Sequence, residues 1–241
     1  MRIILIITLL GVILCKEGYA TRYWDCCKPS CSWTGNAGAG NEAKQCDKSM
    51  NLISDYSAAS MCDGGPATTC LSQIPWSEGN TGYAFAATPG GSGDCGKCYK
   101  LKFTGEGKYE TKLNHQKLKD KTLIVMASNI GYDVAGGQFD VMIPGGGVGL
   151  FNGCNDILKG TSLGAQYGGL LSDCETEVGY SGSDEDIYTN RKSCLTKKCE
   201  GFSNTQAKKG CKFLADFMEA AGNPKVDYES TSCPSSLKSK Y

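Results

Sequence analysis

The chain has 241 residues, and its 25 basic side chains balance 25 acidic ones. Because no basic block stands out, nucleic acids and anionic membranes are poor partners, and a neutral partner is favoured. His115 is the only histidine and lies in a polar segment, where we expect a solvated loop residue. A Ser-His-Asp or Cys-His nucleophile is therefore disfavoured, and the chemistry must depend on carboxylates, tyrosine or lysine.

Residues 1–20 have the layout of a secretory signal peptide. Arg2 gives a positive start, residues 3–15 form an apolar run, and Ala20 offers a small residue at the expected cleavage point. The run is too short for a membrane span, which takes roughly 20 apolar residues. Cleavage after Ala20 leaves a secreted chain with a single domain, residues 21–241.

The cysteine count predicts a disulfide framework. Of 15 cysteines, 14 remain once Cys15 leaves with the signal peptide, and an even count in a secreted chain predicts seven disulfides. The spacing Cys95-Gly-Lys-Cys98 resembles that of zinc ligands, but the oxidising compartment and the single histidine argue against a metal. We expect no metal and no cofactor.

The mature chain opens on Tyr23-Trp24-Asp25-Cys26-Cys27. The aromatic residues favour a strand, and the paired cysteines anchor the backbone that follows. Asp25 is therefore held on rigid backbone, as a positioned catalytic group requires. The alternative is a disulfide knot in which the Asp is incidental.

Short strands and few helices follow. Strands are expected beside Tyr23–Trp24 and over residues 83–87, 98–103, 123–128, 139–142 and 226–233. Helical spacing predicts one helix over Ser49–Ser60, capped by Ser49, and another over Thr205–Ala221. Residues 105–120 should form a charged connection, and residues 160–204 a mostly irregular segment. Six strands with helices in insertions predict one compact β barrel.

The strand over residues 139–142 carries Asp140 up to Pro144 and the run Gly145-Gly146-Gly147-Val148-Gly149. Glycine accepts positive φ and lets another surface come close, so an acid at this loop is well placed to meet a ligand. A phosphate cradle is disfavoured because the Gly-Lys-Ser/Thr ending is missing. The other alternative is a glycine-rich barrel corner with a solvated Asp.

Two motifs carry a resemblance to a known family. Residues 21–31 closely resemble the signature that opens glycoside hydrolase family 45 endoglucanases (cellulases), and residues 139–154 resemble the same family's second motif. Residues 73–76, 84–88 and 167–169 also match. The resemblance covers essentially the whole mature chain. It implies a mostly β fold, a disulfide-rich six-stranded double-psi β barrel with inserted loops and short helices. It also implies a long open groove for a β-1,4-glucan chain, whose internal bonds are hydrolysed with inversion. Because a chain that binds a polymer in an open groove needs no partner, we expect a monomer.

By the same resemblance, Asp25 is the general base, Asp140 the general acid and Asp133 a third, assisting acid. Tyr23 matches an aromatic residue beside the base, and Trp33 a sugar-stacking residue. Inversion requires an acid and a base on opposite faces of the sugar, with their carboxyl groups about 6.5–9.5 Å apart. The acid must stay protonated near neutral pH, so burial or a negative neighbour such as Asp133 should raise the pKa of Asp140.

Further candidates for substrate binding are Lys28, which is near the base in sequence, and the glycines Gly145, Gly146 and Gly147. Gln138 stands where a family member can carry His, with an expected effect on binding subsites. The disulfide pairs that the resemblance implies are Cys26–Cys154, Cys27–Cys62, Cys31–Cys95, Cys46–Cys70, Cys98–Cys233 and Cys174–Cys211, with Cys194–Cys199 as an extra local bridge.

Two other classes of protein remain as alternatives. A non-hydrolytic, wall-loosening protein of the expansin type shares the barrel but lacks the acid that matches Asp25. A small disulfide-rich binder of the barwin kind would leave both acids incidental. Within the enzyme class, cellulose, mixed-linkage glucan, xyloglucan and glucomannan remain open as substrates. With no cellulose-binding module apparent, weak action on crystalline cellulose is expected.

Overall fold

Seven strands of the computed structural model form one sheet, within a structure that describes residues 15–131, 133–158 and 160–241. The strands are β1 (Lys16–Tyr23), β2 (Trp76–Glu78), β3 (Thr81–Thr88), β4 (Cys98–Gly107), β5 (Thr122–Ile130), β6 (Gln138–Met142) and β7 (Pro224–Thr231). They follow the order β2-β3-β5-β4-β7-β1-β6, and β6 also pairs with β3. Six strands therefore close into a barrel, while the short β2 adds to the outer edge of β3.

The barrel contains two parallel strand pairs among its antiparallel ones. β1 runs parallel to β6, and β3 runs parallel to β5. The interior is filled by Leu101, Phe103, Leu123, Val125 and Phe139, which are all buried. This closed ring agrees with the expected double-psi β barrel, and each strand expected from the sequence is present.

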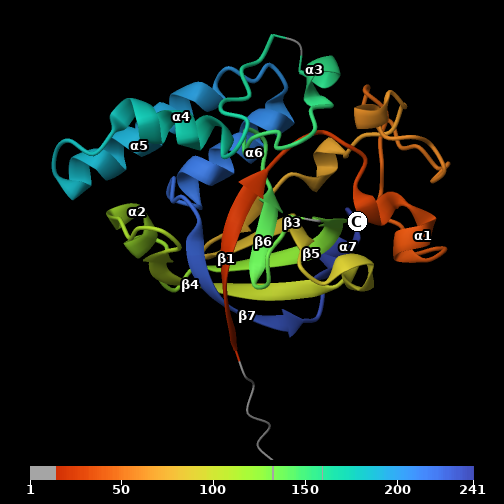
Figure 1. The fold of residues 1–241 in the computed structure, drawn as a ribbon, viewed down its shortest axis with the longest axis horizontal. Coiled ribbons are helices and arrows are strands. Elements are labelled where there is room, and N and C mark those ends of the chain that lie inside the picture. Colours follow the sequence, from red (N-terminus) through yellow and green to blue (C-terminus); the bar gives the residue numbers. More distant parts are fainter. Residues whose placement is uncertain (1–14, 132, 159) are drawn as a thin grey trace, which may run out of the picture.

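The helices of the described residues lie around the barrel, and the longest of them cover one end. They are α1 (Thr34–Ala37), α2 (Leu113–Gln116), α3 (Cys154–Ile157), α4 (Gly169–Val178), α5 (Asp184–Cys199), α6 (Thr205–Asp216) and α7 (Ser235–Lys238), with 3₁₀ turns at Ser30–Ser32, Met61–Asp63, Leu71–Gln73 and Gly91–Asp94. Figure 1 shows α4, α5 and α6 packed side by side above the strands. The tip of β1, which leads to Asp25, points towards this same end.

The helix expected over Ser49–Ser60 is wrong, because this segment is a loop. The carboxylate of Asp47 accepts the backbone N–H groups of Ser49 (2.8 Å) and Asn51 (3.0 Å), and Asp55 does the same for Ser57 (2.9 Å). Such local bonds compete with helix formation. Leu52, an apolar residue within this segment, is 65% exposed.

The irregular segment expected over residues 160–204 is also wrong, since it contains α4 and α5. Ser183 and Asp186 form a capping box at the start of α5. The last long helix, α6, ends at Asp216 rather than Ala221, because the backbone at Glu219 turns to a φ of 55°. The residues beyond it stay buried, as the apolar pattern requires.

His115 is buried at 1% exposure, so its expected place in a solvated loop is wrong. Its Nδ1 accepts the backbone N–H of Lys112 (3.0 Å), so the ring proton lies on Nε2, which donates to the carbonyl of Gly222 (2.8 Å). The imidazole therefore links α2, which lies inside the charged connection, to the segment before β7 by a hydrogen bond.

Seven disulfides form, and five of the implied pairs are confirmed: Cys26–Cys154, Cys27–Cys62, Cys31–Cys95, Cys46–Cys70 and Cys98–Cys233. The remaining pairs are Cys174–Cys194 and Cys199–Cys211, so the pairs Cys174–Cys211 and Cys194–Cys199 are wrong. Five positions along a helix turn a side chain by about 140°. Cys194 and Cys199 of α5 therefore face different neighbours, α4 and α6.

The expected signal cleavage point lies inside β1. Lys16 to Tyr19 pair with β7, and Ala20 is buried at 1% exposure beside Phe139. Most of the predicted signal peptide, residues 1–14, lies outside the described residues. Within the described part of the chain, every helix falls short of the length and apolar character that crossing a membrane requires.

Candidate active site

One pocket brings the three predicted acids together. Its volume is about 280 Å³. It is lined by Tyr23, Asp25, Ala87, Asn129, Ile130, Gly131, Asp133, Val134, Asp140, Val148, Gly149, Leu150 and Phe151. Asp25 and Asp140, which are 115 positions apart in sequence, therefore line the same pocket, as the sequence motifs predict.

Strand register explains this meeting. In the parallel pair β1–β6, Thr21 lies opposite Asp140 and Tyr23 opposite Met142. β3 flanks β6 on the other side, where Ala87 pairs with Asp140. Asp25 lies two residues beyond the end of β1, and the chain therefore carries it past the barrel end towards which Asp140 of β6 lies.

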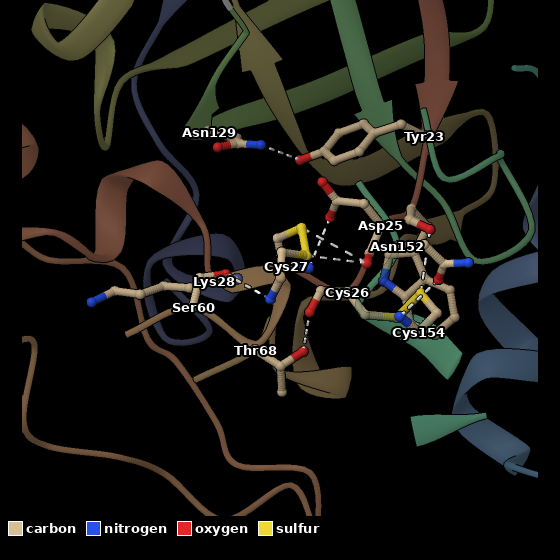
Figure 2. The surroundings of a disulfide bond; sticks show 12 residues. Tyr23, Asp25, Cys26, Cys27, Lys28, Ser60, Thr68, Asn129, Asn152 and Cys154 are labelled. Atoms are coloured by element: carbon tan, nitrogen blue, oxygen red, sulfur yellow. Dashed lines mark hydrogen bonds between the residues drawn. A yellow bond between two sulfur atoms is a disulfide. The ribbon is translucent and has the colours of Figure 1, made fainter. Parts of the chain in front are cut away.

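Asp25 is held by covalent and hydrogen bonds on either side (Figure 2). Its carboxylate Oδ1 accepts the backbone N–H of Cys27 (2.9 Å), and its carbonyl accepts that of Gly153 (2.8 Å). Cys26 takes a left-handed φ of 57° and forms the disulfide with Cys154. A non-glycine residue held at positive φ is strained, and here the disulfide maintains it.

The two carboxyl groups have different pKa values. Burial raises the pKa of Asp25 to about 6, against the lowering effect of the Cys27 hydrogen bond. Burial raises the pKa of Asp140 further, to about 7. The charges of Asp133 and Asp25 add to that increase, while the hydrogen bond from Thr21 (2.7 Å) opposes it. Asp133, exposed on the loop before β6, is thus a negative neighbour of Asp140, the role expected from the sequence.

Tyr23 is positioned by Asn129, which sequence reasoning missed. The Nδ2 of Asn129 donates to the Tyr23 hydroxyl (3.0 Å), and its Oδ1 accepts the Ser30 backbone N–H (2.8 Å) and the Ser30 hydroxyl. Burial and the charges of Asp25 and Asp140 raise the pKa of Tyr23 well above its usual value. Its phenol stays neutral and can donate a hydrogen bond into the pocket. The only sequence signal for Asn129 is its place at the end of an apolar strand.

Lys28, a candidate for substrate binding because it is near Asp25 in sequence, is not among the residues that line the pocket. Its amino group donates to the carbonyls of Tyr56 (2.7 Å) and Ala58 (2.9 Å), and Figure 2 shows it turned away from Asp25. It also lies 3.2 Å from the ring centroid of Trp33. Trp33 is half-buried and lies outside the pocket that holds the acids.

Gly145, Gly146 and Gly147 are buried, so the expectation that they contact substrate is wrong. The carbonyl of Gly147, whose φ is 100°, accepts the backbone N–H of Trp24 (2.7 Å), and that of Gly145 accepts the N–H of Leu170 (2.9 Å). These glycines form the close corner between β6 and its neighbours. Residues 148–151, next in the chain, line the pocket instead, with Leu150 and Phe151 exposed at its rim.

Among the described residues, no group of three or more His, Cys, Asp or Glu side chains is arranged to hold a metal ion. The chemistry that the pocket offers is that of paired carboxyl groups, one easier to ionise than the other, beside a neutral phenol. Such a pair can give a proton and accept one within the same reaction.

The family model for Glycosyl hydrolase family 45 matches residues 17–181. The chain belongs to this family. Relatives of this family 45 chain include Endoglucanase B of Cellvibrio japonicus, 43% identical over 235 residues that cover 93% of the chain and 45% of the relative. A putative endoglucanase type K of Fusarium oxysporum is 37% identical over 92% of the chain and 51% of the relative. The chain thus spans about half the length of these two relatives.

A relative from the springtail Cryptopygus antarcticus matches along most of its own length. This endoglucanase is 35% identical over 93% of the chain and 87% of the relative. A crystal structure of cellulase from the same animal superimposes with a TM-score of 0.72, at 32% identity, and covers 95% of this chain and 96% of that one. The family 45 fold therefore extends over nearly the whole chain.

Proposed function

We propose that this chain is an endo-β-1,4-glucanase that inverts the anomeric carbon, with Asp25 as general base and Asp140 as general acid. The observation that carries this proposal is the pair of carboxyl groups in one pocket, with pKa values of about 6 and about 7. Relatives that are named endoglucanases give it further support.

Each carboxyl group has one role in this mechanism. Asp140, protonated below its pKa of about 7, gives its proton to the glycosidic oxygen as the bond to C1 breaks. Asp25, ionised above its pKa of about 6, removes a proton from the water that attacks C1 on the opposite face. Asp133 assists by holding the proton on Asp140, and the Tyr23 phenol donates a hydrogen bond within the pocket.

The proposed substrate is the backbone of a β-1,4-glucan, with cellulose first and xyloglucan or glucomannan as alternatives. Exposed Leu150 and Phe151 give the rim of the pocket an apolar surface against which a sugar ring can stack. We further propose that the protein is secreted as a monomer after loss of its signal peptide, which seven disulfides favour.

Reducing-sugar release from carboxymethyl cellulose, xyloglucan and glucomannan tests the function. We expect Asp25→Ala and Asp140→Asn each to lower kcat by about 10²–10⁴-fold, as loss of a general acid or base does. Asp120→Asn, an exposed acid on the turn before β5, is the matched control and should retain activity. Proton NMR of the first product should show the α-anomer.

Wild-type protein that releases no sugar from any of the three glucans would refute hydrolysis. Extension of cell-wall material by that same protein would then favour the non-hydrolytic, expansin-type alternative. Activity that survives in both acid variants would instead refute the assignment of Asp25 and Asp140.

A further inference from the structure

Gln138 begins a chain of hydrogen bonds that ends on the general acid. Its Oε1 accepts the hydroxyl of Tyr19 (2.9 Å) and the backbone N–H of Ala135 (3.1 Å). Its Nε2 donates to the hydroxyl oxygen of Thr21 (3.0 Å), and Thr21 donates to Oδ1 of Asp140 (2.7 Å). All three side chains come from β1 and β6, which pair in parallel.

The direction of this chain is fixed from its outer end. A backbone N–H can only donate, so the atom of Gln138 that faces Ala135 must be the amide oxygen. The amide NH₂ then faces Thr21, whose oxygen accepts its proton. The single hydroxyl proton of Thr21 is left for Asp140. Oδ1 of Asp140 is therefore an acceptor, and a proton carried by this carboxyl group belongs on Oδ2.

We propose that Gln138 is a positioning residue that acts through Thr21 to keep the proton of Asp140 on Oδ2, the oxygen that serves the leaving group. This inference rests on the proposed function, because it needs Asp140 to be the general acid. When the Oδ2–H bond breaks, the proton passes to the glycosidic oxygen, and the electron pair of the C1–O bond leaves with that oxygen. Thr21 then stabilises the new carboxylate through Oδ1.

The charges around Asp140 show why the residue at position 138 matters. The titratable groups that face Asp140 are Arg22, Tyr19 and Tyr23 of β1, Asp25 beyond that strand, and Asp133 of the β5–β6 loop. The two acids favour the proton on Asp140, and Arg22 opposes them. Gln138 orients the proton while adding no charge to this balance.

The test is the pH dependence of kcat and kcat/KM for Gln138→Glu and Thr21→Val beside wild type. A carboxylate at position 138 cannot donate, so the Thr21 hydroxyl turns towards it, and Asp140 loses a hydrogen bond and gains a negative neighbour. For Gln138→Glu we expect the basic limb of the pH–rate profile to move to higher pH by at least about half a unit. We also expect kcat to fall about tenfold, with KM within about twofold of the wild-type value.

Thr21→Val removes the same hydrogen bond to Asp140 without adding charge, so its basic limb should also move up. Gln116→Glu, an exposed position on α2, is the matched control for the added charge and should leave the profile unchanged. Thr21→Val also carries the test alone if thermal unfolding shows that Gln138→Glu does not fold.

Basic limbs that coincide with that of wild type in both variants would overturn the inference. A shift in Gln138→Glu without one in Thr21→Val would overturn the route through Thr21, because charge alone would explain it. Asp140→Asn, assayed in parallel, separates the two proposals. If that variant keeps wild-type activity, the proposed function fails, whereas an inactive Asp140→Asn with unshifted Gln138 and Thr21 variants refutes the positioning role alone.

Discussion

In the proposed mechanism, the Asp25 and Asp140 carboxyl groups set the pH range in which the site works. The base must be ionised, which favours pH above about 6, and the acid must be protonated, which favours pH below about 7. We therefore expect a bell-shaped profile of kcat/KM with its maximum between about 6 and 7, falling about tenfold per pH unit on each side. Because the two groups interact, the limbs report the pair. Initial rates on a soluble glucan between pH 4 and 9, in one buffer mixture, would measure this profile, and a maximum below pH 5 would contradict it.

The residues of the site differ in how far the sequence reveals them. Asp25, Asp140 and Tyr23 lie in the two motifs, Asp133 follows from the same resemblance, and the structure brings all four to one pocket. Some hydrogen-bond partners that tune them, such as Thr21 and Cys27, lie in the first motif, but Asn129 does not. Asn129 reaches Tyr23 from another strand. Such partners depend on strand register and strand curvature, which a single sequence does not specify.

At the scale of elements, strands were easier to predict than helices. The strands carry β-branched and aromatic runs bounded by turn residues, so their sequence and their burial agree. Helix α5 was missed because its inward stripe is interrupted by Arg191, at 1% exposure. The sequence does carry a signal for the start of this helix, because Ser183 and Asp186 have the spacing of a capping box.

The N-terminal half of β1 gives a prediction about processing and stability. Lys16 to Tyr19 pair with β7, and this pairing closes the barrel between β1 and β7. A chain that begins at Thr21 loses this pairing, and we expect it to be less stable by about 2–4 kcal/mol than one that begins at Lys16, since a backbone hydrogen bond contributes roughly 0.5–1.5 kcal/mol. Thermal unfolding of both chains would measure the difference.

Mass spectrometry of the secreted protein would show which N-terminus the cell produces. Equal unfolding temperatures for the two chains would contradict a structural role for Lys16 to Tyr19, and cleavage after Ala20 would then carry no penalty for the fold.

At the scale of the whole molecule, the disulfides divide into two sets that cross-link different parts of the fold. Five of them join the barrel and the loops around the site, including those that flank Asp25. The other two join α4 to α5 and α5 to α6. The resemblance predicted the first set correctly. Both pairs of the second set involve α5, a helix that the sequence analysis does not predict, and both predicted pairs are therefore wrong.

This division predicts unequal effects when single disulfides are removed. The bond Cys26–Cys154 spans 128 residues, whereas Cys199–Cys211 spans 12. Loop-closure entropy predicts that these two disulfides raise the free energy of unfolding by at most about 5 and about 3 kcal/mol. These are upper values because the remaining disulfides shorten both effective loops. Removing Cys26–Cys154 also frees the backbone beside Asp25, so the Cys26→Ala/Cys154→Ala variant should lose at least tenfold in kcat/KM, while Cys199→Ala/Cys211→Ala serves as its matched control and keeps activity.

Guanidinium unfolding of both double variants, with kcat/KM measured under conditions in which each is folded, would test this difference. Two variants of equal stability would show that chain entropy does not dominate these cross-links. A folded Cys26→Ala/Cys154→Ala variant with undiminished kcat/KM would show that hydrogen bonds from Cys27 and Gly153 suffice to hold the base. A loss of activity confined to that variant would instead assign the disulfide to the catalytic geometry, and its stabilising effect would be secondary.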